Sequence, residues 1–526
     1  MSAFPSQLHA LLEPRGYPHP VRAVELIETH VSWILLTGEL AYKIKRPVHY
    51  AFVDLRAPEH RAFLCHEELR LNRRFAPELY LDVCPITLDG GAARMSGDGP
   101  VIEHAVRMRQ FAREQELDRL LAAGRVTAAE LAVFGRELAG IHARLPLPQP
   151  AQRWGRPEQV RAVVCDNLAE CTRATEALGE TPSPRSLQEP LMMRLETALP
   201  LLTARFAAGR VRECHGDLHT RNIVRRGGEL RAFDCLEFEP ALRWTDVADE
   251  IAFLVADLDA RRRPAHAQAF LAGYLEQSGD YPAVALLPLF KAHRALVRAK
   301  VAALSAAQPG ALAAAADDAR VQLRMYLACA RRSLAPRTPL LVLMCGLSGS
   351  GKSWIAAQLA PPLEALPLRS DIERKRLAGL TPLEPAGAGV GEGLYSEAAT
   401  LRVYEHLAQC AGDILAGGYN VLVDATFGRR AERARFAALA ARVGARPCVV
   451  YCEAPAELLQ ARIRERARSA DDPSDAGPAV LAWQQAHFEP ADPGEGLPVF
   501  AVATSEPGSL ERLLVRIGAQ LTVSAL

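Results

Sequence analysis

An eight-residue segment at 346–353, GLSGSGKS, has the residue types and spacing that hold nucleotide phosphates. Its glycines let the backbone wrap so that N–H groups face the phosphates, while the lysine reaches the β- and γ-phosphates and the last serine ligates Mg²⁺. The apolar run 340–345 leads in and a helical pattern leads out, which is the context that the motif requires. A chance glycine-rich turn is the alternative. The residues predicted to bind ATP are Gly346, Ser348, Gly349, Ser350, Gly351, Lys352 and Ser353.

The elements around this loop alternate between short apolar strands and helices, which predicts a parallel sheet covered by helices on both faces. Strands are expected at 340–345, 365–369, 420–423 and 448–452. Helices are expected at 352–360, 397–416, 429–442 and 455–468. The Gly/Pro-rich stretch 381–393 is expected to form a mobile loop that closes over a ligand.

Polar residues follow these strands at the edge where ligands bind in open α/β sheets. Asp371, after the second strand, is predicted to accept a proton from a substrate hydroxyl. Asp424, after the third strand, is predicted to hold the Mg²⁺ shell, directly or through water. For each carboxylate the alternative is a helix N-cap.

Two arginines, Arg462 and Arg466, lie one helical turn apart, just before the loop 469–477. This arrangement suits a lid that brings arginines to the transferring phosphoryl group. The alternative is a solvated, arginine-rich helix face.

A second constellation lies earlier in the chain, in the segment HGDLHTRN at 215–222 and the following Phe233-Asp234. The dipeptide Gly227-Gly228 between two strand-like runs predicts a hairpin turn that pairs Arg226 with Glu229. Counting back along this hairpin places Asn222 beside Asp234, and these two oxygen donors suit Mg²⁺. Asp217, on the preceding loop, is then placed to accept a hydroxyl proton. An ordinary hairpin with turn-stabilising Asp and Asn is the alternative.

The order of HGDLHxxN, hairpin and Asp resembles the aminoglycoside phosphotransferase family, over about residues 20–330. The resemblance implies that Asp217 is the catalytic base and that Asn222 and Asp234 bind Mg²⁺. Such a fold also needs a strand lysine that contacts phosphates and pairs with a helix glutamate. Lys43 and Lys45 are the candidates, on one face of a strand, with Glu68 favoured over Glu67 as partner. A surface strand edge is the alternative, and only Gly38 is available for a glycine-rich phosphate loop.

The later part, about residues 338–500, is similar to the polynucleotide-kinase and zeta-toxin-like small P-loop kinases. The matching segments are GLSGSGKS, SDIERKRL, VLVDATF and the arginine-bearing lid with DPSDA. This resemblance makes Asp371 the base and Arg374 a contact to substrate or phosphate. The two halves in this order, together with the segments RLNRRFAPELYLDV and VRMRQF, resemble a group of bacterial two-domain proteins. In these proteins an aminoglycoside-phosphotransferase-like domain is fused to an ATP-dependent kinase, and the resemblance covers nearly the whole chain.

The 526 residues are too many for one core, and the clearest boundary is the proline-containing stretch SLAPRTP at 333–339. The fold class expected for 1–335 is an α+β, two-lobed kinase-like domain, with a small lobe at about 20–110 and a helical lobe at about 111–335. An α/β P-loop domain is expected at 336–526. Before the boundary, strands are expected at 31–37, 40–45, 81–88 and 101–109, and helices at 58–74 and over a long Ala-rich stretch at about 285–332.

Composition narrows the partners. A net charge of +1 gives no global field toward nucleic acid, and no apolar run is long enough to span a membrane. The 11 scattered cysteines lack metal spacing and are expected to be buried free thiols, in keeping with a cytoplasmic protein. The oligomeric state is left open.

The expected function is ATP- and Mg²⁺-dependent transfer of phosphate to a hydroxyl of a small molecule, at two nucleotide sites. Two alternatives remain: an N-terminal half that binds ATP or a ligand and regulates the C-terminal kinase, and a kinase of nucleic-acid 5′-hydroxyls.

Overall fold

The computed structural model describes residues 4–50, 53–149, 153–308, 312–384, 393–469, 474 and 476–523. Its contacts divide into two compact units. The first unit contains residues 1–130, 140–166 and 197–257, and the second contains 131–139, 167–196 and 258–526. Several helices that precede residue 336 therefore belong to the unit that carries the P-loop. The boundary at 335/336, between a helix ending at Leu334 and a strand starting at Leu340, stays a prediction.

A six-stranded antiparallel sheet forms the small lobe of the first unit. Its order is β1 (Glu25–Glu28), β2 (Ser32–Leu36), β3 (Leu40–Lys45), β8 (Val101–Arg109), β6 (Tyr80–Asp89) and β7 (Ala92–Met95). Helix α1 (Pro58–Asn72) lies between β3 and β6 in sequence and packs on β6 and β8. The strands and the helix predicted for this region are confirmed, whereas β1 and β7 were not predicted.

The rest of the first unit carries the predicted hairpin, β10 (Ile223–Arg226) and β11 (Glu229–Ala232). Strands β9 (Val211–Glu213) and β12 (Trp244–Asp246) pair beside the loop that precedes this hairpin in sequence. The remaining helices of the predicted helical lobe up to residue 260 are α2 (Leu117–Ala122), α3 (Ala128–Arg144), α4 (Pro157–Ala177), α5 (Gln188–Ala207), α6 (Pro240–Arg243) and α7 (Val247–Ala260).

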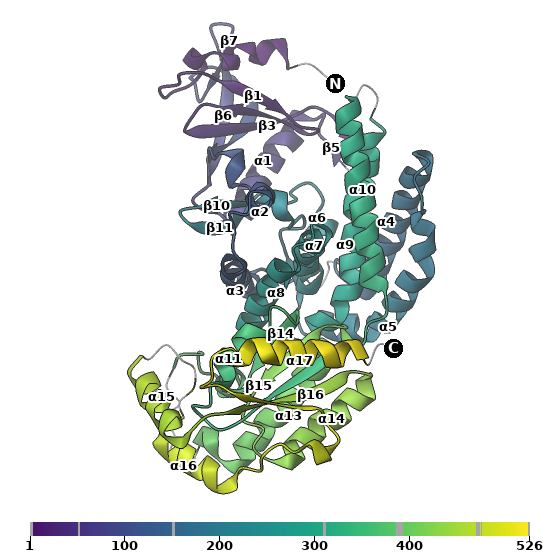
Figure 1. The fold of residues 1–526 in the computed structure, drawn as a ribbon. Helices are drawn as coiled ribbons and strands as arrows, with labels where there is room; N and C mark the ends of the chain where they lie inside the picture. Colours follow the sequence, from purple (N-terminus) through teal and green to yellow (C-terminus); the bar gives the residue numbers. More distant parts are fainter. Residues whose placement is uncertain are drawn as a thin grey trace. The chain divides into compact units, whose positions relative to one another are not determined.

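The helical part of the second unit includes α8 (Pro264–Ser278), α9 (Ala283–Ala306) and α10 (Ala313–Leu334). Helices α9 and α10 pack along each other (Figure 1). The helical stretch predicted at about 285–332 is confirmed, and it consists of these two helices. The sequence does carry a signal for the end of the first helix, the Pro309-Gly310 pair, which the sequence interpretation did not use.

A five-stranded parallel sheet forms the core of the P-loop part, in the order β14 (Ala365–Arg369), β15 (Asn420–Asp424), β13 (Leu340–Cys345), β16 (Arg446–Glu453) and β17 (Val499–Ala503). All four predicted strands are present. Because β17 was not predicted, one edge of the sheet was missing from the sequence interpretation.

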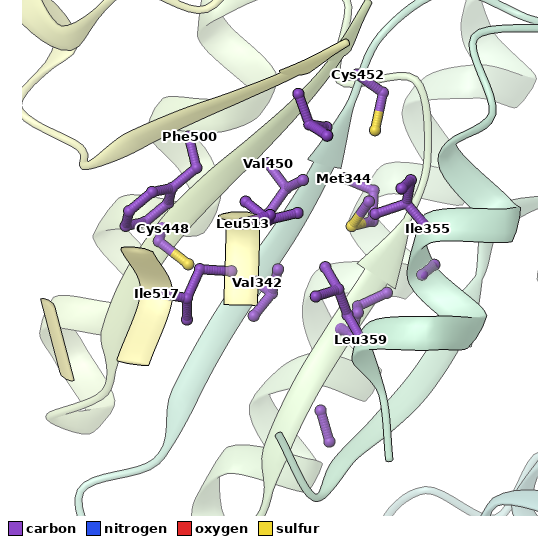
Figure 2. Close-up of a cluster of buried hydrophobic side chains, with 14 of the residues drawn as sticks. Val342, Met344, Ile355, Leu359, Cys448, Val450, Cys452, Phe500, Leu513 and Ile517 are labelled. Carbon is purple, nitrogen blue, oxygen red and sulfur yellow. The ribbon is translucent and has the colours of Figure 1, made fainter. Parts of the chain in front are cut away.

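Helices cover both faces of this sheet, as predicted. On one face, α11 (Lys352–Leu359) and α17 (Ser509–Val523) bury Ile355, Leu359, Leu513 and Ile517 against the sheet (Figure 2). Helices α13 (Glu397–Ala416) and α14 (Arg430–Val443) pack on the other face (Figure 1). The remaining helices of this part are α12 (Ser370–Leu377), α15 (Ala456–Ser469) and α16 (Pro478–His487). The predicted fold class is confirmed for both parts of the chain.

Candidate functional site

The predicted phosphate loop lies between the end of β13 and the start of α11, as its mechanism requires. Gly346, Gly349 and Gly351 have φ values of 140°, 80° and 87°, which residues other than glycine rarely adopt. The Gly346 amide donates to the carbonyl oxygen of Thr426 at 3.1 Å, so the loop is fixed to the residues that follow β15. The ammonium of Lys352 lies back over the loop, 2.8 Å from the Leu347 carbonyl oxygen.

Ser353 and Asp424 are brought together at this edge of the sheet, near enough for the Ser353 hydroxyl to lower the pKa of the Asp424 carboxyl group. Burial raises the pKa of Asp424, and the Ser353 hydroxyl and the charge of Lys352 partly offset this effect. Burial likewise lowers the pKa of Lys352, with Asp424 opposing it. A hydroxyl and one carboxylate are oxygen donors that suit Mg²⁺ together with phosphate oxygens and water, so these residues fit the ion.

Asp371 lies in the first turn of α12, and its negative charge acts on both Lys352 and Asp424. It is not the N-cap of this helix, since that position is Arg369. Arg369 was missed by the sequence interpretation. Its Nε atom lies 3.9 Å from the Asp424 carboxylate and adds positive charge to the nucleotide edge.

Arg374, on the same helix, is engaged elsewhere. Its guanidinium donates to the Leu394 carbonyl oxygen at 2.5 Å and stacks over the Tyr395 ring at 5.0 Å. It therefore anchors the segment that follows the loop predicted at 381–393, of which residues 385–392 lie outside the described residues. A contact of Arg374 with substrate or phosphate stays a prediction.

The two predicted lid arginines have different partners. Arg462 donates to the Gly349 carbonyl oxygen at 3.2 Å and to the Thr504 hydroxyl at 2.9 Å, and that hydroxyl donates to the Ser350 carbonyl oxygen at 2.7 Å. Arg466 donates to the Ala476 carbonyl oxygen at 2.8 Å. Much of the predicted lid loop, residues 470–473 and 475, lies outside the described residues. Arg462 thus supports the phosphate loop through the Gly349 carbonyl oxygen and through Thr504. Its action on a phosphoryl group stays a prediction.

Two further contacts to the phosphate loop were missed. Thr504 directly follows β17, so the edge rule that found Asp371 and Asp424 would have found it had that strand been predicted. Gln484 on α16 accepts a hydrogen bond from the Ser348 amide at 2.8 Å. Nothing in the local sequence marks Gln484, because its partner is 136 residues away.

The first unit brings Asp217, Asn222 and Asp234 into one site. The hairpin pairs Arg226 with Glu229, as predicted, and the Phe233 amide donates to the Asn222 carbonyl oxygen at 2.9 Å. The Asn222 side-chain amide donates to the Asp217 carbonyl oxygen and carboxylate, both at 2.9 Å, which leaves its oxygen as the atom able to face a cation. Asp234 adopts a left-handed φ of 64°. One amide oxygen and one carboxylate fit Mg²⁺.

His215 ties this site together in its neutral form. Its Nδ1 accepts from the Asp217 amide at 3.3 Å, so Nε2 carries the proton and donates to the Phe233 carbonyl oxygen at 2.8 Å. Burial lowers the pKa of His215 to about 4, which keeps this tautomer neutral at physiological pH. The amides of His215 and Gly216 donate to the Glu250 carboxylate at 2.8 and 3.1 Å.

The predicted pairing of Lys43 with Glu68 is confirmed, at 2.8 Å. Lys45 also bonds Glu68, and in addition Glu237, which the sequence interpretation missed. Burial alone would raise the pKa of Glu68, but the two lysines lower it to about 2. Glu67, the other candidate, pairs with Arg70 instead, at 2.7 Å.

No glycine-rich loop joins β1 to β2. That connection is Thr29-His30-Val31, and the Thr29 hydroxyl and carbonyl close it by bonding Ser32 and Arg46. Gly38, with a φ of 101°, lies at the next turn, between β2 and β3. In the part of the chain that the structure describes, no group of three or more His, Cys, Asp or Glu side chains is arranged to hold a metal ion. Each candidate Mg²⁺ site therefore relies on one carboxylate aided by Ser or Asn. A search of the described helices finds none with the length and apolar character of a membrane span.

Comparisons with known proteins agree with this organisation. A family model described as an AAA domain matches residues 341–491, the P-loop part. The uncharacterized protein Rv2004c of Mycobacterium tuberculosis (strain H37Rv) is 31% identical over 474 residues, which are 90% of this chain and 92% of that protein.

Two solved structures are also similar. A choline/ethanolamine kinase family protein from Mesorhizobium loti is 14% identical, covers 60% of this chain and 94% of its own, and has a TM-score of 0.33. A gluconokinase from Sinorhizobium meliloti 1021 is 20% identical, covers 36% of this chain and 100% of its own, and has a TM-score of 0.25.

The chain combines an aminoglycoside-phosphotransferase-like N-terminal part, with its Lys43–Glu68 pair and hairpin site, and a P-loop kinase-type C-terminal part. Its similarity to the mycobacterial protein extends through both parts. The chain therefore belongs to the same protein family as Rv2004c of Mycobacterium tuberculosis.

Proposed function

We propose that the P-loop part is a kinase that transfers the γ-phosphate of ATP to a hydroxyl group of a small molecule. The observation that carries this proposal is the phosphate loop wrapped at Gly346, Gly349 and Gly351 between β13 and α11. Ser353 and Asp424 meet beside this loop, and the charge of Asp371 acts on both Lys352 and Asp424. A cation-binding pair, a phosphate-binding lysine and a general base thus share one edge of one sheet.

In this reaction the backbone amides of the loop and Lys352 bind the phosphates and hold the γ-phosphorus in line with the acceptor. Bound Mg²⁺, held by Ser353 and Asp424, would neutralise negative charge on the phosphates. Asp371 takes the proton of the acceptor hydroxyl as its oxygen forms the new P–O bond. The bond between the γ-phosphorus and the bridging oxygen breaks, and ADP leaves with that oxygen.

The hairpin site of the first unit is the second proposed kinase site, with Asp217 as base and Asn222 and Asp234 as Mg²⁺ ligands. A specific observation supports the alternative that this half binds a ligand and regulates without catalysis. Lys43 is bonded to Asp234 at 2.5 Å, and the β1–β2 connection has no glycine with which to wrap a phosphate. In this alternative the ion pair keeps Asp234 from a metal.

The test uses the full chain with Mg-ATP and a panel of hydroxyl acceptors that includes sugars, amino alcohols and a 5′-hydroxyl oligonucleotide. Lys352→Ala is expected to abolish transfer at the P-loop site. Asp217→Ala in the Lys352→Ala background then reports the hairpin site, and Lys300→Ala, which removes an ammonium paired with Glu170 of α4, is the matched control. The kinase proposal fails if neither variant changes any turnover. If the oligonucleotide is the acceptor whose phosphorylation Lys352→Ala abolishes, and no small molecule is phosphorylated, the nucleic-acid alternative is favoured.

A further inference from the structure

Helix α12 carries Asp371 on one side and a fully buried carboxylate, Glu373, on the other. An ionised carboxylate away from water is costly unless several donors satisfy it. Three donors do so here. The Tyr281 hydroxyl lies 2.8 Å from Oε1, while His406 Nε2 and Arg376 Nε each lie 3.0 Å from Oε2. Burial would raise the pKa of Glu373, but these partners lower it overall.

These partners come from different parts of the second unit. Tyr281 precedes α9, His406 belongs to α13, and Arg376 is on α12 itself. Arg376 also reaches the last turn of α8, where it donates to the carbonyl oxygens of Glu276 and Gln277. Carbonyl groups at a helix C-terminus lack intrahelical partners and attract positive charge, so the C-terminus of α8 interacts favourably with the Arg376 guanidinium.

Separate contacts join α8 and α9 to the sheet at the amino ends of β14 and β15, the opposite end of these strands from α12. Gln268 of α8 donates to the Ala365 carbonyl oxygen at 2.6 Å, where edge strand β14 begins. Lys291 of α9 donates to the Tyr419 hydroxyl at 3.1 Å, next to the start of β15. Helices that precede the predicted 335/336 boundary therefore support strands β14 and β15 and helix α12, whereas the loop 346–353 is held by Arg462, Thr504 and Gln484.

We propose that Tyr281 and Glu373 are positioning residues that hold α12, so that helices α8 and α9 set the acceptor side of the P-loop site. The inference rests on the proposed function, because it assigns Asp371 to that side. Loss of a hydrogen bond to Glu373 then slows phosphoryl transfer without weakening nucleotide binding, since the nucleotide contacts come from a separate set of residues.

Tyr281→Phe in the full chain tests the inference, because it removes one donor from Glu373 and keeps the ring. The matched control is Tyr419→Phe, which also removes a contact to the helices but lies at the amino end of β15, away from the nucleotide edge. We expect Tyr281→Phe to lower the Asp371-dependent part of Mg-ATP turnover roughly fivefold, as loss of one charge-assisted hydrogen bond would. The Kd for the Mg complex of AMP-PNP is expected to stay within about twofold, and Tyr419→Phe should change neither quantity.

Amide hydrogen exchange separates this inference from the proposed function. Tyr281→Phe is expected to speed exchange in residues 370–377 and not in 346–353, whether or not an acceptor is known. Unchanged exchange at 370–377, or a nucleotide Kd that rises in step with the loss of turnover, would overturn the inference. Absence of any Asp371-dependent turnover in the unaltered protein would instead count against the proposed function, with the exchange result still standing on its own.

Discussion

Lys43 Nζ lies 2.5 Å from Asp234 Oδ1, so the lysine predicted to contact phosphates is bonded to the carboxylate predicted to hold a metal. The same ammonium lies 2.8 Å from Glu68, which Lys45 also bonds. Glu68 is thus the shared counter-ion of two buried lysines, and binding of Mg-ATP at this site would have to exchange Asp234 for phosphate at Lys43.

The first prediction concerns Glu68. Glu68→Ala leaves two buried ammonium groups short of a partner, and breaking a buried ion pair in this way costs about 3–5 kcal/mol. We expect the free energy of unfolding of the first unit to fall by about that amount, measured by urea denaturation. Glu28→Gln on strand β1 is the control, because the Glu28 side chain is 37% exposed and lies 3.9 Å from Arg46. Its cost should stay below about 1 kcal/mol, and equal losses in the two variants would refute the shared role of Glu68.

The second prediction separates Asp424 from Asp371. Asp424→Asn removes the charge beside Ser353, so affinity for AMP-PNP measured by calorimetry with Mg²⁺ should fall about 10- to 100-fold, with little change when Mg²⁺ is left out. Asp371→Asn should keep the Mg²⁺-dependent affinity and lose transfer, because a base acts only on the acceptor proton. A similar loss of Mg²⁺-dependent affinity in both variants would contradict the separate roles.

Site contacts could be predicted from the sequence where they depend on residues close together in the chain. Gly227-Gly228 sets the hairpin register, and that register alone brings Asn222 next to Phe233-Asp234. The phosphate loop is similarly local, since glycines, lysine and serine follow one another between a strand and a helix. The predicted Lys43–Glu68 pair was also recoverable, because Lys43 and Lys45 are rare lysines in an arginine-rich chain.

Contacts across long stretches of sequence could not be predicted in this way. Glu237 reaches Lys45 from 192 residues away, and Tyr281 reaches Glu373 from 92. Periodicity predicts the face of an element that is buried and does not identify what covers that face. Arg374 shows the same limit within the predicted site. The resemblance to small P-loop kinases implied a contact with substrate or phosphate, and nothing in the sequence indicated the contacts of its guanidinium with Leu394 and Tyr395.

The third prediction tests whether Arg462 acts on the loop or on the reaction. Its bonds to Gly349 and Thr504 favour a supporting role, so Arg462→Lys should weaken ADP and ATP binding equally, by roughly three- to tenfold, as loss of about one hydrogen bond would. Turnover at saturating ATP should change little. Arg464→Lys, at an exposed position of the same helix, is the control. Slower turnover with unchanged binding would restore the catalytic role predicted from the sequence.

The fourth prediction concerns acid sensitivity of the hairpin site. Burial lowers the pKa of His215 to about 4 and that of His142 to about 3, well below their usual 6.5. Between pH 6.5 and 4 the unfolded chain therefore binds protons at these positions that the folded chain does not. Stability contributed by the neutral histidines is fully present above pH 6.5 and is lost as the pH falls, by about 2 kcal/mol for His215 at pH 5.

Hydrogen exchange of residues 211–235 over a urea series, at pH 7 and pH 5, measures this loss. His215→Gln cannot take up the proton, so its exchange midpoint should shift less between the two pH values, although the variant is less stable at both because its bonds to Asp217 and Phe233 are altered. The pKa of Glu68 is about 2 in the folded chain and about 4.5 in the unfolded chain. Both values lie below pH 5, so Glu68 contributes little to the change in stability between pH 7 and pH 5. Identical pH shifts in the unaltered protein and in His215→Gln would show that His215 is protonated in the folded site, and the neutral tautomer that bridges Asp217 and Phe233 would have to be abandoned.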